Sequence, residues 1–184
     1  DQLIAILSQI RDGKIDDESL ETLHEKIENS WDLDEDHMTK LFTHNADVDR
    51  VNEGKLAQID APSERFVAEC FGDKKVIETI KKSVLAPEQL VLKVWARIMF
   101  VRNNYEQGYQ NGTLGTVSEF QPDGSPVVQT ESGRIITVKP EDWVIEDDGY
   151  GPVASYSQIP LRLAWAITVH KSQGMTLDSA LIDL

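Results

Sequence analysis

The chain has 184 residues, enough for one domain or for one domain with a small insert. Hydrophobic residues make up 40% of the chain and charged residues 27%, which excludes a disordered protein. The formal net charge is −14, so non-specific attraction of the whole chain to nucleic acid is not expected. No apolar run approaches the roughly 18 residues of a membrane helix, and we expect no membrane partner. The single cysteine, Cys70, excludes an internal disulfide and favours a reducing compartment.

The negative charge is unevenly distributed along the sequence. Residues 1–36 carry 3 basic and 12 acidic side chains, and residues 105–155 carry 2 basic and 9 acidic ones. Residues 37–104 carry 11 basic and 9 acidic side chains, and residues 156–184 carry 2 of each. An anionic ligand is therefore expected on the two segments that are neutral or weakly basic.

Two amphipathic helices are predicted in the first acidic segment. The apolar stripe of the first stops near Gly13, and Asp16 or Asp17 is placed to cap the second. A short buried strand is predicted at residues 40–43, followed by a helix over 46–56 with Asn45 as its N-cap. A strand that runs into a capped helix is half of a βαβ unit, so an α/β fold is expected.

The middle of the chain predicts mainly strands. We expect a strand over 65–70, a helix over 74–84, and one long strand over 90–101 with apolar residues in alternation. Shorter segments rich in β-branched residues then alternate with turns at Asp123-Gly124 and Ser132-Gly133, which suggests a small barrel. These segments are residues 113–120, 127–130 and 134–138.

The last part of the chain changes in composition again. Residues 160–167 are predicted to be a helix-like apolar segment, and residues 168–175 a polar segment that contains glycine. Residues 181–184 predict the start of a buried strand. Because the sequence ends inside this strand, we expect the chain to be a fragment of a larger protein.

Common catalytic signatures are missing from the sequence. It contains neither GxxxxGK[ST] nor GxGxxG, so no self-contained nucleotide site is predicted. The four histidines form neither HxxxH nor HExxH, and we expect no metal site.

Two polar clusters remain as candidate sites. Thr43, His44 and Asn45 lie where a predicted strand meets a helix N-terminus, and such an end suits a phosphate group. The simpler alternative is ordinary N-capping by Asn45. The second cluster is the segment 168–176, whose hydroxyl, imidazole, amide and ammonium groups can donate to phosphate or sugar oxygens. The alternative there is a polar loop in which Gly174 ends a helix.

The second cluster is part of a longer resemblance. The stretch PLRLAWAI followed by TVHKSQGMTLD, residues 160–178, closely resembles motif V of superfamily-one helicases of the RecD and petite-integration-frequency type. LFTHNADVDRVN resembles the motif IV strand and helix of that family, and LIAILSQIRDG resembles the helix that closes its first motor domain. LVLKVWARIMFVRNN, followed by NGTLGTV, resembles the segment that leads into its inserted barrel. Trp95 departs from the pattern, which has a glycine at this position.

The resemblance implies a fold and an activity that composition alone does not show. It implies an α/β chain with a partial RecA-like domain and an inserted small all-β Src-homology-three-like barrel. Residues 1–36 would end the first motor domain, 37–104 and 156–184 would form the second, and 105–155 would be the barrel. The parent protein would be an ATP-dependent helicase that uses Mg²⁺, moves 5′ to 3′ on single-stranded DNA and unwinds duplexes. Catalytic residues would lie outside these 184 residues.

The resemblance also implies roles for the residues of the two polar clusters. Those expected to contact DNA are Thr43, His44, Asn45, Thr168, His170, Lys171 and Ser172. Gln173 and Gly174 would lie at the nucleotide cleft and sense the bound nucleotide. Trp165 or Tyr109 could add base stacking, although core packing is the simpler role for Trp165.

Two alternatives stay open from the sequence. One is the α subunit of a RecBCD-type helicase–nuclease, which would add recombination or repair subunits as partners. The other is a non-catalytic module in which the acidic barrel binds a protein. The expected location is the bacterial cytoplasm, or the nucleus or mitochondrion if the source is eukaryotic.

Overall fold

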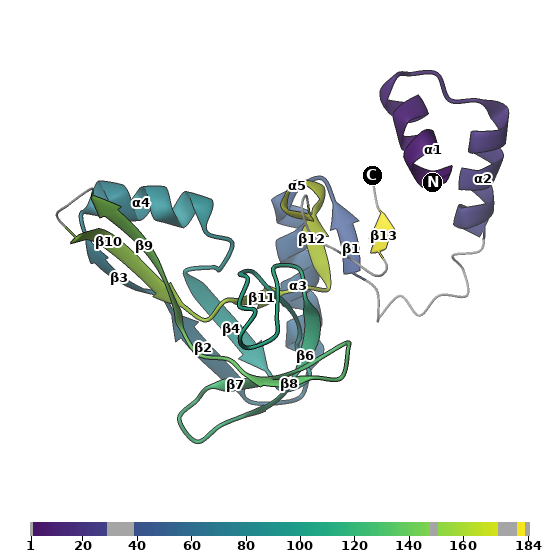
Figure 1. The fold of residues 1–184 in the computed structure, drawn as a ribbon. Helices are drawn as coiled ribbons and strands as arrows, with labels where there is room; N and C mark the ends of the chain where they lie inside the picture. Colours follow the sequence, from purple (N-terminus) through teal and green to yellow (C-terminus); the bar gives the residue numbers. More distant parts are fainter. Residues whose placement is uncertain (1, 29–38, 148–150, 173–179, 183–184) are drawn as a thin grey trace. The chain divides into compact units, whose positions relative to one another are not determined.

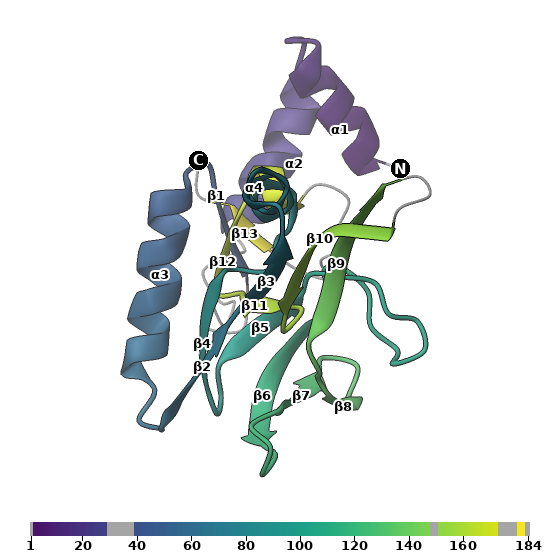
Figure 2. The ribbon, with the colours of Figure 1, turned by 90° about the vertical axis from the view of Figure 1, so that its left-hand side faces the viewer.

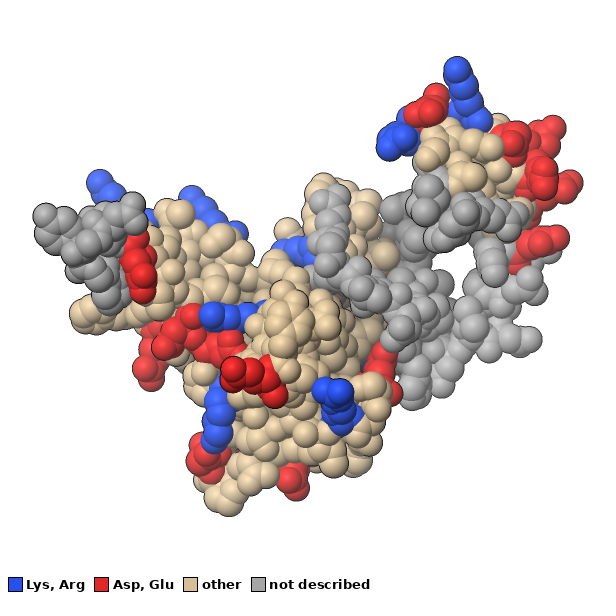
Figure 3. Space-filling view, viewed as in Figure 1, with Lys and Arg blue, Asp and Glu red and all other residues tan. Residues whose placement is uncertain are grey.

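The computed structural model describes residues 2–28, 39–147, 151–172 and 180–182, which are drawn as ribbon in Figure 1. The chain divides into two compact units, residues 1–36 and 37–184. The first unit contains α1 (Gln2–Arg11) and α2 (Asp17–Glu28). Asp16 caps α2, because its Oδ1 accepts a hydrogen bond from the Ser19 N–H at 2.8 Å, which lowers the pKa of this carboxyl group. Figure 3 shows acidic side chains gathered over α2.

A parallel sheet in the second unit brings together segments that are far apart in sequence. Its strands are β1 (Thr39–Phe42), β12 (Ala166–Thr168) and β13 (Ala180–Ile182), in the order β12-β1-β13. Helix α3 (Asn45–Gln58) follows β1 directly and packs on it and on β12 (Figure 1). The strands predicted at 40–43 and near 181 are confirmed, as is the expected α/β class.

The helix-like segment predicted at 160–167 is wrong. The chain there forms two strands, β11 (Leu161–Leu163) and β12, before the short helix α5 (Val169–Ser172). β11 pairs antiparallel with β5, and β12 pairs parallel with β1. A short apolar run can form either a helix or a strand, and here the pairing with β5 and β1 stabilises the strands.

The predicted hairpins form one antiparallel sheet of order β11-β5-β6-β7-β8. Its further strands are β5 (Arg97–Phe100), β6 (Leu114–Phe120), β7 (Pro126–Thr130) and β8 (Ile135–Thr137). Gly124 and Gly133 take φ of 82° and 83° in the tight turns, which is the left-handed region that glycine enters without strain. Buried residues of this sheet, among them Phe100, Val117 and Val128, belong to the largest hydrophobic core.

The long strand predicted over 90–101 is interrupted. A turn at residues 94–96 separates β4 (Gln89–Lys93) from β5, and Trp95 in this turn has a φ of 75°. β4 pairs with β2 (Ser63–Val67) instead of continuing into the five-stranded sheet. The strand predicted over 65–70 is likewise divided into β2 and β3 (Glu69–Gly72).

A third antiparallel sheet has the order β3-β10-β9, with β9 (Glu141–Asp147) and β10 (Gly151–Gln158). Helix α4 (Lys74–Ser83), capped by Asp73, packs on this sheet (Figure 2). Its Ile77 and Ile80 form a hydrophobic cluster with Ala154 and Tyr156 of β10. The sequence predicts α4 correctly but does not predict β9.

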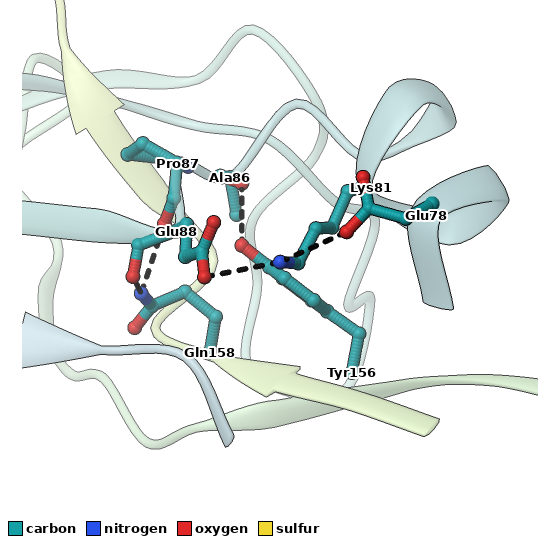
Figure 4. Close-up of polar contacts among 7 residues, drawn as sticks. All are labelled: Glu78, Lys81, Ala86, Pro87, Glu88, Tyr156 and Gln158. Carbon is teal, nitrogen blue, oxygen red and sulfur yellow. Dashed lines mark hydrogen bonds and ion pairs between the residues drawn. The ribbon is translucent and has the colours of Figure 1, made fainter. Parts of the chain in front are cut away.

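Polar contacts join β10 to the chain before β4 (Figure 4). The Tyr156 hydroxyl donates to the Ala86 carbonyl oxygen at 3.0 Å, and Gln158 Nε2 donates to the Pro87 carbonyl oxygen at 2.9 Å. Lys81 Nζ lies 3.0 Å from a carboxylate oxygen of Glu88, and this contact raises the pKa of the lysine.

The range 105–155 shares two sheets with the chain around it. In the five-stranded sheet, β5 and β11 lie outside the range, and in the three-stranded antiparallel sheet β10 extends beyond residue 155.

None of the helices in the described part of the chain has the length and hydropathy of a membrane-spanning segment.

Candidate nucleic-acid interface

The parallel pairing of β1 with β12 places the two predicted polar clusters side by side. The register pairs Lys40 with Ala166, Leu41 with Ile167 and Phe42 with Thr168, so both strands end at the same edge of the sheet. The segment 43–45 continues from β1, and α5 continues from β12 (Figure 1). Parallel α/β sheets bind ligands at the carboxyl ends of their strands, and both clusters lie at that edge.

The first cluster is open to solvent. Thr43 and His44 are exposed, and Thr43 Oγ1 lies 2.7 Å from His44 Nδ1 in a hydrogen bond whose direction depends on the imidazole tautomer. His44, with φ −116° and ψ 138°, is the N-cap of α3 and makes no side-chain capping bond. The prediction that Asn45 caps this helix is wrong by one position, because Asn45 is already helical. The exposed end of α3 thus keeps backbone donors available for an acceptor.

The second cluster divides into inward and outward side chains. Thr168 is only 3% exposed, and its Oγ1 accepts a bond from the Lys171 N–H at 3.4 Å. Ser172 Oγ donates to the Val169 carbonyl oxygen at 2.8 Å. His170 is exposed and Lys171 is half-buried, so these two residues offer the donors of this cluster. Gln173 and Gly174, the predicted nucleotide-sensing pair, lie outside the described residues.

Charges of both signs influence one another near α5: Lys171 lies in this helix, Arg162 lies in β11, and Asp49 acts on both of them. Burial lowers the pKa of the Lys171 ammonium group, and nearby Arg162 lowers it further, while Asp49 opposes both effects. Burial likewise lowers the pKa of Arg162, and its Nε and Nη1 are buried without a hydrogen-bond partner among the described residues. A bound anion close to Lys171 would restore its preference for the charged form. The sequence analysis missed Arg162; its one available signal was a charge inside an apolar run.

The two aromatic residues considered for stacking are both used in the core. Tyr109 is 1% exposed and stacks on Phe100 with ring centroids 4.1 Å apart. The Tyr109 hydroxyl donates to Glu141, and burial raises the pKa of this phenol. Trp165 is partly buried against the main core, in agreement with the simpler role expected for it. Within the described ranges, no group of His, Cys, Asp and Glu side chains could hold a metal ion.

This chain is similar in sequence to DNA helicases named Pif1. Residues 75–120 match the family model described as DNA helicase Pif1, 2B domain. An ATP-dependent DNA helicase Pif1 of Psychrobacter sp. is 36% identical over 209 aligned residues, which cover 86% of this chain and 32% of the relative. This chain corresponds to a segment of Pif1-type superfamily-one helicases. The resemblance seen in the sequence is thus confirmed.

Solved Pif1 structures share the fold as well. A crystal structure of Bacteroides sp. Pif1 in complex with ADP-AlF4 superposes with a TM-score of 0.80 at 31% identity, covering 97% of this chain and 42% of that one. A crystal structure of Bacteroides Pif1 bound to ssDNA gives a TM-score of 0.65 at 28% identity, with coverage of 98% and 42%. The chain spans about a third of the length of the curated Pif1 relative from Psychrobacter.

Proposed function

We propose that this chain is the DNA-gripping part of an ATP-dependent helicase of the Pif1 type, which moves 5′ to 3′ on single-stranded DNA and unwinds duplexes. The observation that carries the proposal is the shared edge at the ends of β1 and β12, where exposed His44 follows β1, and exposed His170 and half-buried Lys171 follow β12. Support comes from the Bacteroides Pif1 bound to ssDNA, whose fold is similar. The relatives' names favour neither a RecBCD-type subunit nor a non-catalytic module.

The proposed contacts are with the DNA backbone. Phosphate oxygens accept hydrogen bonds, and the imidazoles of His44 and His170, the Lys171 ammonium group and the backbone donors at the start of α3 can supply them. Thr168 and Ser172 act indirectly, because their hydroxyl groups hold the turn of α5. Such contacts grip a strand without reading its sequence, as a translocating motor requires.

ATP and Mg²⁺ are proposed ligands of the parent helicase. The sequence has no GxxxxGK[ST] loop to hold the phosphates, so these 184 residues supply at most the sensing pair Gln173 and Gly174. In the parent, ATP hydrolysis would supply the energy for stepping. What the described residues contribute is the grip on the strand between steps.

The finer assignments are also proposals. We assign residues 37–104 and 156–184 to the second RecA-like domain, residues 1–36 to the end of the first motor domain, and residues 105–155 to a Src-homology-three-like barrel. We propose the bacterial cytoplasm as its location, or the nucleus or mitochondrion if the source is eukaryotic.

An unwinding assay on the parent helicase tests the proposal. With ATP and Mg²⁺, the parent should separate a duplex that carries a 5′ single-stranded tail and leave a duplex with a 3′ tail intact. The His170→Ala variant should unwind less at limiting DNA, whereas the control Lys82→Ala, an exposed position on α4, should match the wild type. No unwinding of either substrate, or equal loss in both variants, would overturn the proposal.

A further inference from the structure

One buried amide links the two clusters of the DNA edge. Asn52 lies in α3 and is 5% exposed. Its Nδ2 donates to the Ala166 carbonyl oxygen at 2.9 Å, and its Oδ1 accepts from the Ala166 N–H at 3.0 Å. A single side chain therefore satisfies both backbone groups of one residue in β12.

The direction of these bonds follows from the parallel pairing. The Lys40 N–H donates to the Trp165 carbonyl oxygen at 2.8 Å, so the polar groups of Trp165 face β1 and those of the next residue, Ala166, face away from it. Among the described strands, β12 is the outer strand on that side. The Asn52 amide thus takes the place of a neighbouring strand at this point.

Asparagine is the residue type that fits this position. A primary amide offers a donor and an acceptor in one plane, as a peptide group does. An ionised aspartate of the same shape keeps the acceptor and loses the donor, and a leucine loses both. Because the site is buried, each lost partner leaves an unsatisfied backbone group of Ala166.

The bonds connect the elements that carry the two clusters. Helix α3 begins beside His44, and Ala166 lies two residues before Thr168, the last residue of β12 before α5. We infer that Asn52 is a positioning residue that fixes the spacing between the 43–45 and 168–172 clusters for a DNA strand that contacts both. This inference rests on the proposed function.

Thr39 provides a matched control. Its Oγ1 donates to the Ala164 carbonyl oxygen at 3.0 Å, and the residue is fully buried. This bond also joins distant segments, but it does not involve α3. Thr39 precedes Lys40, where the pairing of β1 with β12 begins, and Ala164 precedes β12. Thr39→Val should lower stability as a lost buried bond does, without changing the spacing of the clusters.

The test is a titration of ATPase rate against single-stranded DNA in the parent helicase. Asn52→Asp should raise the DNA concentration for half-maximal rate about tenfold and change the rate at saturating DNA less than about twofold. Thr39→Val should leave the half-maximal concentration unchanged. An Asn52→Asp variant that loses only the saturated rate, or that matches Thr39→Val, overturns the positioning role. A wild type without DNA-stimulated ATPase would instead contradict the proposed function.

A second measurement uses the unmodified parent and needs no variant to fold. Hydrogen exchange resolved to single amides should show the Ala166 amide exchanging as slowly as the paired amide of Phe100, whose N–H donates to the Thr113 carbonyl oxygen. Exchange of the Ala166 amide at the rate of the exposed N-terminal amides of α3 would show that the Asn52 bonds are absent and would overturn the inference.

Discussion

Trp95 carries backbone strain at an exposed position. Its φ of 75° is in the left-handed region, and its side chain is 68% exposed. A residue with a Cβ atom loses roughly 1–2 kcal/mol in this conformation, whereas glycine does not. The resemblance predicts glycine at this position, and the positive φ in the turn between β4 and β5 supplies a physical reason for it. The alternation of apolar residues over 90–101 predicts one continuous strand, so the sequence does not indicate this turn.

We predict that Trp95→Gly increases the free energy of unfolding relative to Trp95→Ala by about 1 kcal/mol, because only glycine relieves the strain. Alanine is the matched control, since both variants remove the exposed indole. Urea denaturation of the two variants measures the difference. Equal stability of the two would show that the turn is not strained.

Because of Tyr156, we expect the folded protein to lose stability at alkaline pH. Burial raises the pKa of this phenol from 10.0 to about 12, and Cys70 and Glu88 add to the effect. In the unfolded chain the phenol ionises near pH 10, while in the folded chain it stays protonated to about pH 12. The unfolded state therefore binds fewer protons over this window, and the free energy of unfolding falls as pH rises through it.

Tyr156→Phe should lose about 1 kcal/mol at neutral pH, since the bond to the Ala86 carbonyl oxygen is lost, but should decline less steeply between pH 10 and 12. Denaturant titrations across this pH range compare the two proteins. Parallel curves for wild type and variant would exclude Tyr156 as the cause of the decline.

At the scale of elements, the sheets join the predicted insert to its surroundings. The resemblance implies an inserted barrel at 105–155, but β5 pairs with β6, and β3 pairs with β10. Removing residues 105–155 would take away β6, β7, β8 and β9 and uncover Ile98 and Phe100. Burial of each such side chain stabilises by about 1.5–3 kcal/mol, so several losses exceed the stability of an ordinary domain.

We therefore expect that replacing 105–155 by a short linker unfolds the second unit. Circular dichroism of the shortened protein should show loss of β signal. Removal of residues 1–36, a separate compact unit, is the control and should preserve that signal. A folded protein without 105–155 would support the separable barrel.

Elements with strong local signals are those that the sequence predicts correctly. The tight turns at Gly124 and Gly133 identify the hairpins, and the amphipathic pattern after Asp73 identifies α4. β9 was missed because its sequence, EDWVIED, becomes a strand through pairing with β10. The segment 160–167 was assigned wrongly because its state depends on β1 and β5, which are distant in sequence.

At the scale of the whole molecule, the sequence contains no GxxxxGK[ST] phosphate-binding loop. Phosphoryl transfer depends on groups that position the phosphates and their Mg²⁺, and the sequence has no phosphate-binding loop. We predict that the purified 184-residue chain releases no phosphate from ATP, with or without single-stranded DNA. DNA-stimulated phosphate release from this chain would contradict the proposal that the catalytic residues of the parent lie outside these 184 residues.

The residues of the candidate site stay a prediction from the sequence, and their arrangement in space comes from the structure. Motif resemblance predicts that the segments 43–45 and 168–172 contact DNA, and the parallel pairing of β1 and β12 brings these two segments to the same edge. The inward position of Thr168 and the contribution of Arg162 depend on packing, which the sequence does not reveal.

The central claim is that these two segments form one surface for single-stranded DNA. Fluorescence anisotropy of the parent helicase, titrated at fixed salt against a labelled oligonucleotide, tests it most directly. His44→Ala and His170→Ala should each weaken binding about tenfold, since each removes a donor to phosphate, while exposed Lys82→Ala should bind as the wild type does. Unchanged affinity in both histidine variants would contradict the claim.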